Sequence, residues 1–293
     1  MRLRFLAVVA ATLALLLGTG TAALAAPAAS GSSSRPTYYL ALGDSLAQGI
    51  QPNSSGKSVP TNQGYVDDLY AAYRRQVPGL QLVKLGCPGE TTHSMIKGGV
   101  CPYPDGNQLA AAVHFRATHP GRVAVITLDI GANNVDGCIS AGTLNPNCFA
   151  GGTTAAKQDL PQILRALRRA YPAVPIVGMN YYDPFLAAWR QGPAGQALAT
   201  ASVVATNAFN RVLKQAYIAS GVPVADVSAA FFTNTTTKLP VVNLPVNVAT
   251  ICLLTWMCAP APVGPNIHPR PAGYLVIAGA FLKVRSLRAG SPG

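Results

Sequence analysis

The sequence predicts an α/β protein in which five parallel strands form one sheet with helices on both faces. Five short stretches rich in β-branched or large apolar residues each precede a segment with the apolar spacing of a helix. Strands connected in this way are parallel, and their right-handed crossovers place helices on both sides of the sheet. The first three strands also end in turns that combine glycine with polar residues, and the ligands of open α/β sheets bind at that edge.

The first strand is predicted over residues 38–42, where large apolar side chains lead up to Gly43. Residues 64–76 follow with a single apolar stripe, as in an amphipathic helix. The third strand, residues 122–130, is β-branched and almost continuously hydrophobic, which is typical of a strand buried on both faces. Between these elements we expect a strand over residues 81–86 and a helix over residues 108–119.

The second half of the chain continues the pattern with two long interruptions. Residues 135–152 are rich in Gly, Asn and Cys and predict a loop, and residues 232–265 predict a second, longer loop that is rich in Asn, Thr and Pro. An amphipathic helix contains Leu160 and Leu167, and Pro161 must lie in its first turn or at a kink. The remaining predicted elements are a strand over residues 174–180, a helix over 196–219, a strand over 222–227 and a helix over 271–287.

The first 25 residues have the layout of a secretory signal peptide. Arg2 and Arg4 precede an apolar run over residues 5–17, and the small residues at 23–25 fit a cleavage site. The run is shorter than the roughly 20 residues that a membrane span needs. We therefore expect a secreted protein.

The rest of the chain is predicted to be a disordered lead-in over residues 26–36 and a single domain over residues 37–293. Without Arg2 and Arg4 it carries 20 basic and 10 acidic residues, a net charge of +10. No basic stripe interleaved with aromatic residues is present, which argues against a nucleic-acid partner. For a positively charged exported protein, an anionic lipid or cell-wall surface is the more natural partner. We expect a monomer.

Six cysteines in an exported chain predict disulfide bonds. Sequence alone leaves 15 pairings open, but the order of the cysteines favours nearest neighbours. A metal site is the competing interpretation, but no C-x2-C pair or histidine cluster accompanies these cysteines, so we do not expect one. The favoured pairs are Cys87 with Cys101, Cys138 with Cys148, and Cys252 with Cys258.

Four residues are predicted to gather at the carboxyl edge of the sheet: Ser45, Gly89, Asn133 and His268. Ester hydrolysis needs a nucleophile, a base and donors for the oxyanion. Ser45 and His268 can take the first two roles, and the Asn133 amide with the backbone N–H groups of Ser45 and Gly89 can be the donors. Each residue also has a purely structural alternative. Ser45 and Asn133 can cap helices, Gly89 can serve a turn, and His268 can be a surface residue.

The motifs around these four residues resemble those of the SGNH (GDSL) hydrolase family. They cover residues 38–278 and read ALGDSLAQG, GCPGETT, DIGANN and NIHPRPAGY. The signal peptide and the cysteines further resemble the secreted actinobacterial esterases, lipases and phospholipases of that family. The resemblance implies a three-layer α/β/α domain of flavodoxin-like topology and no cofactor. It also implies a Ser45 nucleophile, a His268 base and an oxyanion hole formed by Ser45, Gly89 and Asn133.

Two positions depart from the family pattern. The family usually has Asp three residues before the histidine, and here that residue is Pro265. Some members orient the histidine with a backbone carbonyl, so we expect the carbonyl of Pro265 or of a near neighbour to accept the Nδ1 proton of His268. Asn134 stands where the family often has Asp, which removes a charge beside Asn133.

The expected function is therefore secreted ester hydrolysis of the esterase or lipase kind, with acyl esters or lipids as substrates and a role in lipid degradation. Two alternatives remain open: a carbohydrate acetylesterase, and a catalytically weak exported binding protein of the same fold. The two predicted long loops contain apolar side chains that could line an acyl groove or simply pack beneath the loops, among them Phe149, Phe232, Leu253, Leu254 and Trp256.

Overall fold

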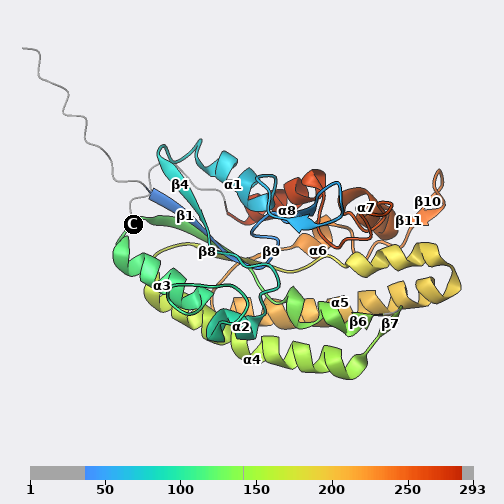
Figure 1. Cartoon of the computed structure of the whole chain (residues 1–293), viewed down its shortest axis with the longest axis horizontal. Coiled ribbons are helices and arrows are strands. Elements are labelled where there is room, and N and C mark those ends of the chain that lie inside the picture. The colour runs from blue at the N-terminus through green and yellow to red at the C-terminus, as the bar shows by residue number, and fades with distance from the viewer. Residues whose placement is uncertain (1–36, 141, 286–293) are drawn as a thin grey trace, which may run out of the picture. The chain divides into compact units, whose positions relative to one another are not determined.

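Five parallel strands form the central sheet in a computed structural model that describes residues 37–140 and 142–285. The predicted signal peptide and lead-in lie outside the described residues. The strands lie in the order β4 (Leu80–Lys84), β1 (Thr37–Gly43), β5 (Val123–Asp129), β8 (Ile176–Met179) and β9 (Val224–Ala225) (Figure 1). This order confirms the predicted five-stranded flavodoxin-like sheet. Successive strands are added on one side of β1 and then, from β5 onward, on the other, and ligands of such sheets bind at the carboxyl ends of the strands at this switch point.

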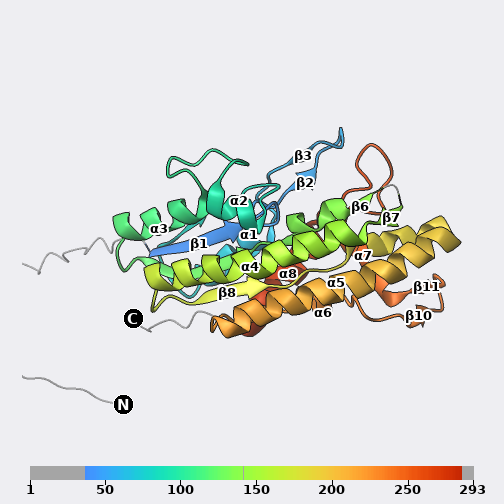
Figure 2. The same ribbon diagram turned by 90° about the horizontal axis from the view of Figure 1, so that it is seen from below.

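Helices cover both faces of this sheet, which completes the predicted three layers. In Figures 1 and 2, α1 and α8 lie on one face and α3, α4 and α5 on the other. The long helices are α1 (Tyr65–Tyr73), α3 (Gln108–Thr118), α4 (Pro146–Ala170), α5 (Pro193–Ala219) and α8 (Pro271–Val284). The short ones are α2 (Thr92–Lys97), α6 (Val227–Ala230), α7 (Val246–Leu254), η1 (Ala132–Asn134), η2 (Asp136–Cys138) and η3 (Pro184–Gln191). Three small hairpins complete the described chain: β2 (Gln51–Pro52) with β3 (Ser58–Val59), β6 (Ile139–Ser140) with β7 (Thr143–Leu144), and β10 (Lys238–Leu239) with β11 (Leu244–Pro245).

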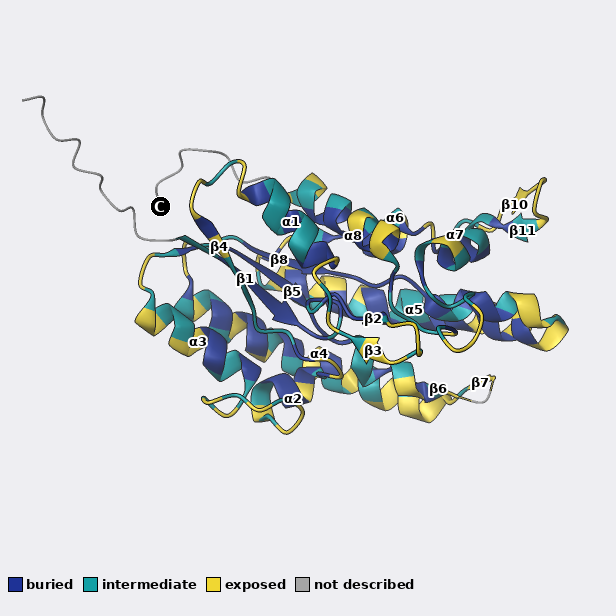
Figure 3. Ribbon diagram, turned by 45° about the horizontal axis from the view of Figure 1, so that its top comes forward, coloured by how far each residue is buried: buried dark blue, intermediate teal, exposed yellow. Residues whose placement is uncertain are grey.

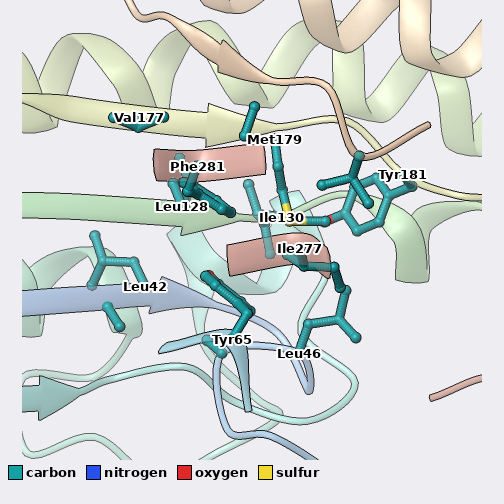
Figure 4. Packing of buried hydrophobic residues seen from close by; sticks show 14 of the residues in the cluster. Leu42, Leu46, Tyr65, Leu128, Ile130, Val177, Met179, Tyr181, Ile277 and Phe281 are labelled. Carbon is teal, nitrogen blue, oxygen red and sulfur yellow. The ribbon is translucent and has the colours of Figure 1, made fainter. Parts of the chain in front are cut away.

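The sheet is the centre of the hydrophobic core. The central strands β1, β5 and β8 are buried over most of their length, whereas the edge strand β4 is only partly buried and the helices expose their outer faces (Figure 3). Tyr65 of α1 stacks on Phe281 of α8, with 5.0 Å between the ring centroids, and both rings lie close to Leu42 and Leu128 of the sheet (Figure 4). Because a buried hydroxyl needs a partner, Tyr39 hydrogen-bonds Thr127 Oγ1 on the neighbouring strand at 2.8 Å.

The first predicted loop is wrong over its second half, because α4 already begins at Pro146. The side chain of Asn145 caps this helix by accepting from the backbone N–H groups of Asn147 and Cys148, and a proline is favourable at the first helical position. Pro161 consequently lies inside a continuous helix rather than in its first turn. The Gly and Cys residues that suggested a loop are tolerated because the rest of the helix buries a strong apolar stripe.

The second predicted loop also contains regular structure. Residues 232–265 include the β10–β11 hairpin and α7, whose sequence VNVATICLL is apolar enough to pack beside η3 and α8. The alternation of Asn and Thr with apolar residues hid this helix, because it shows little helical periodicity.

The six cysteines form the three bridges that their order in the chain predicted. Cys87–Cys101 closes the loop that carries Gly89, and Cys252–Cys258 joins α7 to the segment before His268. Cys138–Cys148 joins η2 to the first turn of α4. Nowhere in the described ranges does a helix combine the length and the apolar character that crossing a membrane requires.

Replacing Gly178 with alanine should destabilise the fold by about 1–3 kcal/mol, because the new Cβ in β8 would lie 2.2 Å from the Tyr217 ring. Urea unfolding of the oxidised protein measures this change. The matched control is Gly151→Ala in α4, where a Cβ meets no atom within 4 Å and the helix propensity improves. Equal stabilities for the two variants would contradict this account of the packing.

Candidate active site

Ser45 stands on a tight turn at the end of β1. Gly43 has a φ of +136°, and a Cβ at this position would lie 2.0 Å from the backbone oxygen of Asp129, so only glycine fits. The Ser45 carbonyl then accepts from the N–H groups of Gln48 and Ile50 at 3.2 and 3.1 Å. The turn leaves the Ser45 side chain half-buried at the carboxyl edge of the sheet.

A buried carboxyl group holds this turn from below. Asp129 Oδ2 accepts from the backbone N–H groups of Asp44 and Ala47, both at 3.2 Å, while Oδ1 accepts from the Tyr65 hydroxyl. Burial, followed by the charge of the adjacent Asp44, raises the pKa of Asp129 well above its ordinary value. Burial also raises the pKa of Asp44 to about 6. Simultaneous ionisation of the Asp44 and Asp129 carboxyl groups is therefore strongly disfavoured.

Asn133 lies on η1, directly after β5. Its side-chain amide donates to the backbone carbonyl of Glu90 at 2.9 Å, and this contact fixes the amide between the turn after β5 and the turn after β4. One amide N–H is engaged in this bond. The second N–H remains as a donor for another acceptor.

Gln108 connects the turn after β4 to the end of β1. Its side chain bonds both the N–H and the carbonyl of Gly43, at 2.7 and 2.8 Å, and donates to Glu90 Oε2 at 3.2 Å. Gln108 is fully buried at the start of α3. Sequence reasoning missed this residue, because a glutamine at the start of a helix carries no signal of a partner 65 positions away.

Of the four residues predicted to gather at the sheet edge, Gly89 lies outside the pocket that the other three line. It occupies an exposed turn with φ +85°, beside Glu90 and within the loop closed by Cys87. Ser45, Asn133 and His268 all line one pocket, and Gly89 is joined to it through the contact of its neighbour Glu90 with Asn133.

The second departure from the family pattern has a structural reason. Asn134 Oδ1 accepts from the backbone N–H of Thr92 at 3.0 Å, and its amide donates to Thr92 Oγ1 at 2.8 Å. The Thr92 hydroxyl donates its own proton to Asp159 at 3.2 Å. An aspartate at 134 would set a carboxylate oxygen against a hydroxyl whose proton is already used, so the amide suits this position better.

His268 is oriented by Asn266 rather than by the expected carbonyl of Pro265. Asn266 Oδ1 lies 2.7 Å from His268 Nδ1 and 3.0 Å from the His268 backbone nitrogen, and the Asn266 amide donates to Ser58 Oγ at 3.0 Å. The acceptor is therefore a side-chain oxygen one residue closer to the histidine. Asn266 lies two residues before His268, and its side chain reaches forward to the imidazole.

These contacts determine which nitrogen of His268 carries the proton. A backbone N–H can only donate, so the atom that faces it must be the Asn266 oxygen, and this oxygen accepts a second proton from Nδ1. Nε2 is left with a lone pair, as a general base requires. Burial lowers the pKa of His268 to about 4, and Asn266 supplies no negative charge to oppose that effect.

Ser45 lies in a pocket that is partly open to solvent. The Tyr182 hydroxyl donates to the carbonyl of Ile267 at 2.7 Å and so positions the segment that carries His268. In the part of the chain that the structure describes, no group of three or more His, Cys, Asp or Glu side chains is placed to hold a metal ion. The lining consists of Asp44, Ser45, Leu46, Ala132, Asn133, Asp136, Tyr181, Tyr182, Pro184, Ile267 and His268.

Comparisons with known proteins agree with this architecture. A model of the GDSL-like lipase/acylhydrolase family matches residues 41–276. No curated protein matches the chain.

Solved structures resemble the fold at low sequence identity. A phospholipase A1 from Streptomyces albidoflavus NA297 is 18% identical with a TM-score of 0.53, and the match covers 86% of this chain and 100% of that one. An extracellular lipase from Streptomyces rimosus is 18% identical with a TM-score of 0.51, covering 85% and 100%. A lipase from a goat rumen metagenome is 17% identical with a TM-score of 0.53, covering 85% and 97%.

Asn266→Asp should raise the pKa of His268 by about 1–3 units, because a carboxylate beside Nδ1 favours the charged imidazolium. The Asp can still accept from Ser58 and from the His268 backbone N–H, so the geometry is kept. An NMR titration of the imidazole resonances measures the pKa directly. Gln162→Glu makes the same chemical change on the exposed side of α4 and should leave the His268 pKa unchanged. No difference between the two variants would mean that Asn266 does not face Nδ1 in solution.

Proposed function

The chain belongs to the GDSL-like lipase/acylhydrolase family and is an ester hydrolase, and we propose that Ser45 and His268 carry out its reaction through a covalent acyl-enzyme. The observation that carries the proposal is the pocket shared by the two residues together with the Nε2 lone pair of His268. A serine hydroxyl is a weak nucleophile by itself, so it needs a base of this kind beside it.

In the first half of the reaction, Ser45 Oγ attacks the carbonyl carbon of the ester while His268 Nε2 takes the hydroxyl proton. The tetrahedral intermediate then expels the alcohol, which receives the proton from Nε2. In the second half, Nε2 takes a proton from water, the hydroxide attacks the acyl carbon, and the proton returns to Ser45 as the acid leaves. Asn266 positions the ring throughout by accepting a hydrogen bond from the Nδ1–H group.

The negative charge of each intermediate is proposed to rest on three donors: the backbone N–H groups of Ser45 and Gly89, and the free N–H of the Asn133 amide. The contact of Asn133 with Glu90 supports this role, because it holds the amide in place before the charge develops. Donors that need no reorganisation stabilise the transition state most. Gln108 acts through Glu90 and Gly43 as a positioning residue for the same donors.

The substrates are proposed to be acyl esters, including lipids. Tyr181, Tyr182, Pro184 and Leu46 give the pocket a largely apolar wall, which fits an acyl group better than a sugar. Carbohydrate deacetylation is the second candidate. Binding without catalysis is the third, and the neutral acceptor on His268 is the feature that favours it.

The protein is proposed to be secreted and monomeric. The N-terminal pattern and the three disulfide bonds support secretion, because such bonds persist in oxidising compartments. The net positive charge supports attraction to an anionic lipid or cell-wall surface.

Ser45→Ala should abolish hydrolysis of p-nitrophenyl esters from acetate to palmitate without changing the thermal unfolding of the protein, because it removes only the nucleophile. Turnover that depends on Ser45 and peaks at medium or long chains would support the acyl-ester proposal, and a peak at acetate would favour deacetylation. Full activity in the variant would refute the assignment of Ser45. A folded wild-type protein without turnover on any chain length would favour the binding protein.

Asn133→Ala should lower kcat about 10²- to 10³-fold with little change in KM, because the oxyanion exists only after attack has begun. Steady-state kinetics on the best ester of the series measures the split. Asn207→Ala removes a half-buried amide of α5 that pairs with Asn234 and does not line the pocket, and it should leave both constants unchanged. A loss in Asn133→Ala no larger than in this control would show that the amide does not face the oxyanion.

A further inference from the structure

A second cavity, open to solvent, adjoins the pocket of Ser45. The two share Ala132, Asp136, Tyr181, Tyr182 and Pro184, so the second cavity opens directly from the first. We call it the aromatic annex, because it leads from the two shared tyrosines to three phenylalanines on separate elements. These are Phe149 of α4, Phe185 of η3 and Phe209 of α5.

Asp136 is the only acid that lines both cavities. It begins η2, and no residue within 37–140 or 142–285 gives its carboxyl group a hydrogen bond or a salt bridge. Among the described residues, no Lys or Arg lines either cavity. His268 is the one lining residue that could become cationic, and its lowered pKa keeps it neutral. The annex therefore offers an unpaired acid and no fixed positive charge.

This combination is unfavourable for a purely hydrocarbon ligand. An acyl chain would cover the Asp136 carboxyl without giving it a partner, and burying an unpaired polar group costs free energy. A quaternary ammonium group suits the same surroundings well. Its methyl groups pack on aromatic rings, its charge is attracted to the ring faces, and a carboxylate neutralises it.

We propose that the aromatic annex binds an organic cation through Asp136 and the surrounding rings, so that esters with an ammonium group on one arm are preferred substrates. This inference rests on the proposed function of Ser45 and His268, because the annex opens from their pocket. It adds a substrate class that an apolar pocket by itself does not specify.

Cation binding should depend on pH through Asp136. Burial, with the charges of Asp44 and Asp183 added, raises the pKa of Asp136 to about 8. The other ionisable groups that face it are Tyr182 and Tyr181, whose pKa values burial raises further, and neutral His268. Below pH 8 a bound cation must displace the Asp136 proton, so affinity should rise by up to about tenfold per pH unit and level off above pH 8.

The direct test is calorimetric titration of the full protein with tetraethylammonium at pH 6 and pH 8.5. We expect binding at pH 8.5 that weakens at least tenfold at pH 6, and at least tenfold weaker binding to Asp136→Asn at pH 8.5. Phe149→Leu keeps an apolar side chain and should also weaken binding. No binding at pH 8.5, or equal affinity for the wild type and Asp136→Asn, would overturn the proposal.

A pair of isosteric substrates tests the consequence for catalysis. Butyrylcholine and 3,3-dimethylbutyl butyrate differ only in a charged nitrogen against a neutral carbon, so the ratio of their kcat/KM values cancels general effects of a substitution. At pH 8.5 we expect the ratio to favour the choline ester and to fall at least tenfold in Asp136→Asn. If the cation binds in calorimetry but the ratio does not change, the preferred ester carries its charge on the acyl arm. The kcat/KM for the methyl ester of 4-(trimethylammonio)butyrate must then exceed that for the isosteric methyl ester of 5,5-dimethylhexanoate. Failure of both pairs overturns the catalytic part.

The proposal for the annex and the proposal for catalysis can be refuted independently of each other. If the neutral esters are hydrolysed with Ser45 dependence while tetraethylammonium does not bind, the proposed function stands and the annex proposal falls. If no ester is hydrolysed but tetraethylammonium binds in an Asp136-dependent way, the catalytic assignment falls and the cation site remains.

Discussion

The packing of β1 against β5 at the point where the strand order reverses controls the rest of the site. The backbone of Asp129 comes so close to Gly43 that no side chain fits there, and the Asp129 carboxyl accepts two N–H groups from the turn that follows. The position of Ser45 is therefore set by the central strands and not by a flexible loop. Desolvation of the Asp129 carboxyl is the energetic cost of this arrangement, and the raised pKa reflects it.

Amide side chains, rather than ion pairs, connect this turn to its neighbours. Gln108 joins Gly43 to Glu90, Asn133 joins Glu90 to η1, and Asn266 holds the imidazole of His268. An amide both donates and accepts, so it can bridge two backbone groups without bringing a charge into a buried region. The result is a base without a carboxylate partner, and its basicity depends on burial and on a neutral acceptor. Two acids remain at the pocket: Asp44 accepts from the Leu46 N–H and the Tyr181 hydroxyl, whereas Asp136 has no hydrogen-bond partner in the described part of the chain.

The fold was largely predictable, because it follows from hydrophobic patterns that are local in the sequence. The strand around Leu40 and the strand around Ile126 are continuous apolar runs, and a parallel sheet buries such runs on both faces. The pairing of Cys87 with Cys101 was favoured by the order of the cysteines in the chain. The start of α4 was missed, because its decisive signal is a single Asn145–Pro146 pair inside a stretch whose composition is typical of a loop.

The sequence by itself determined the five strands, the edge to which Ser45, Asn133 and His268 belong, and the family motifs, because each of these depends on residues that are close together in the chain. Only the tertiary structure decided that Asn266 rather than Pro265 faces the imidazole, that Gln108 bridges two turns, and that Asp136 lines two adjoining cavities. Such contacts depend on the direction of one side chain and on which distant backbone group lies opposite it. A linear sequence carries no periodic signal for either, since both are set by how the strands and helices pack.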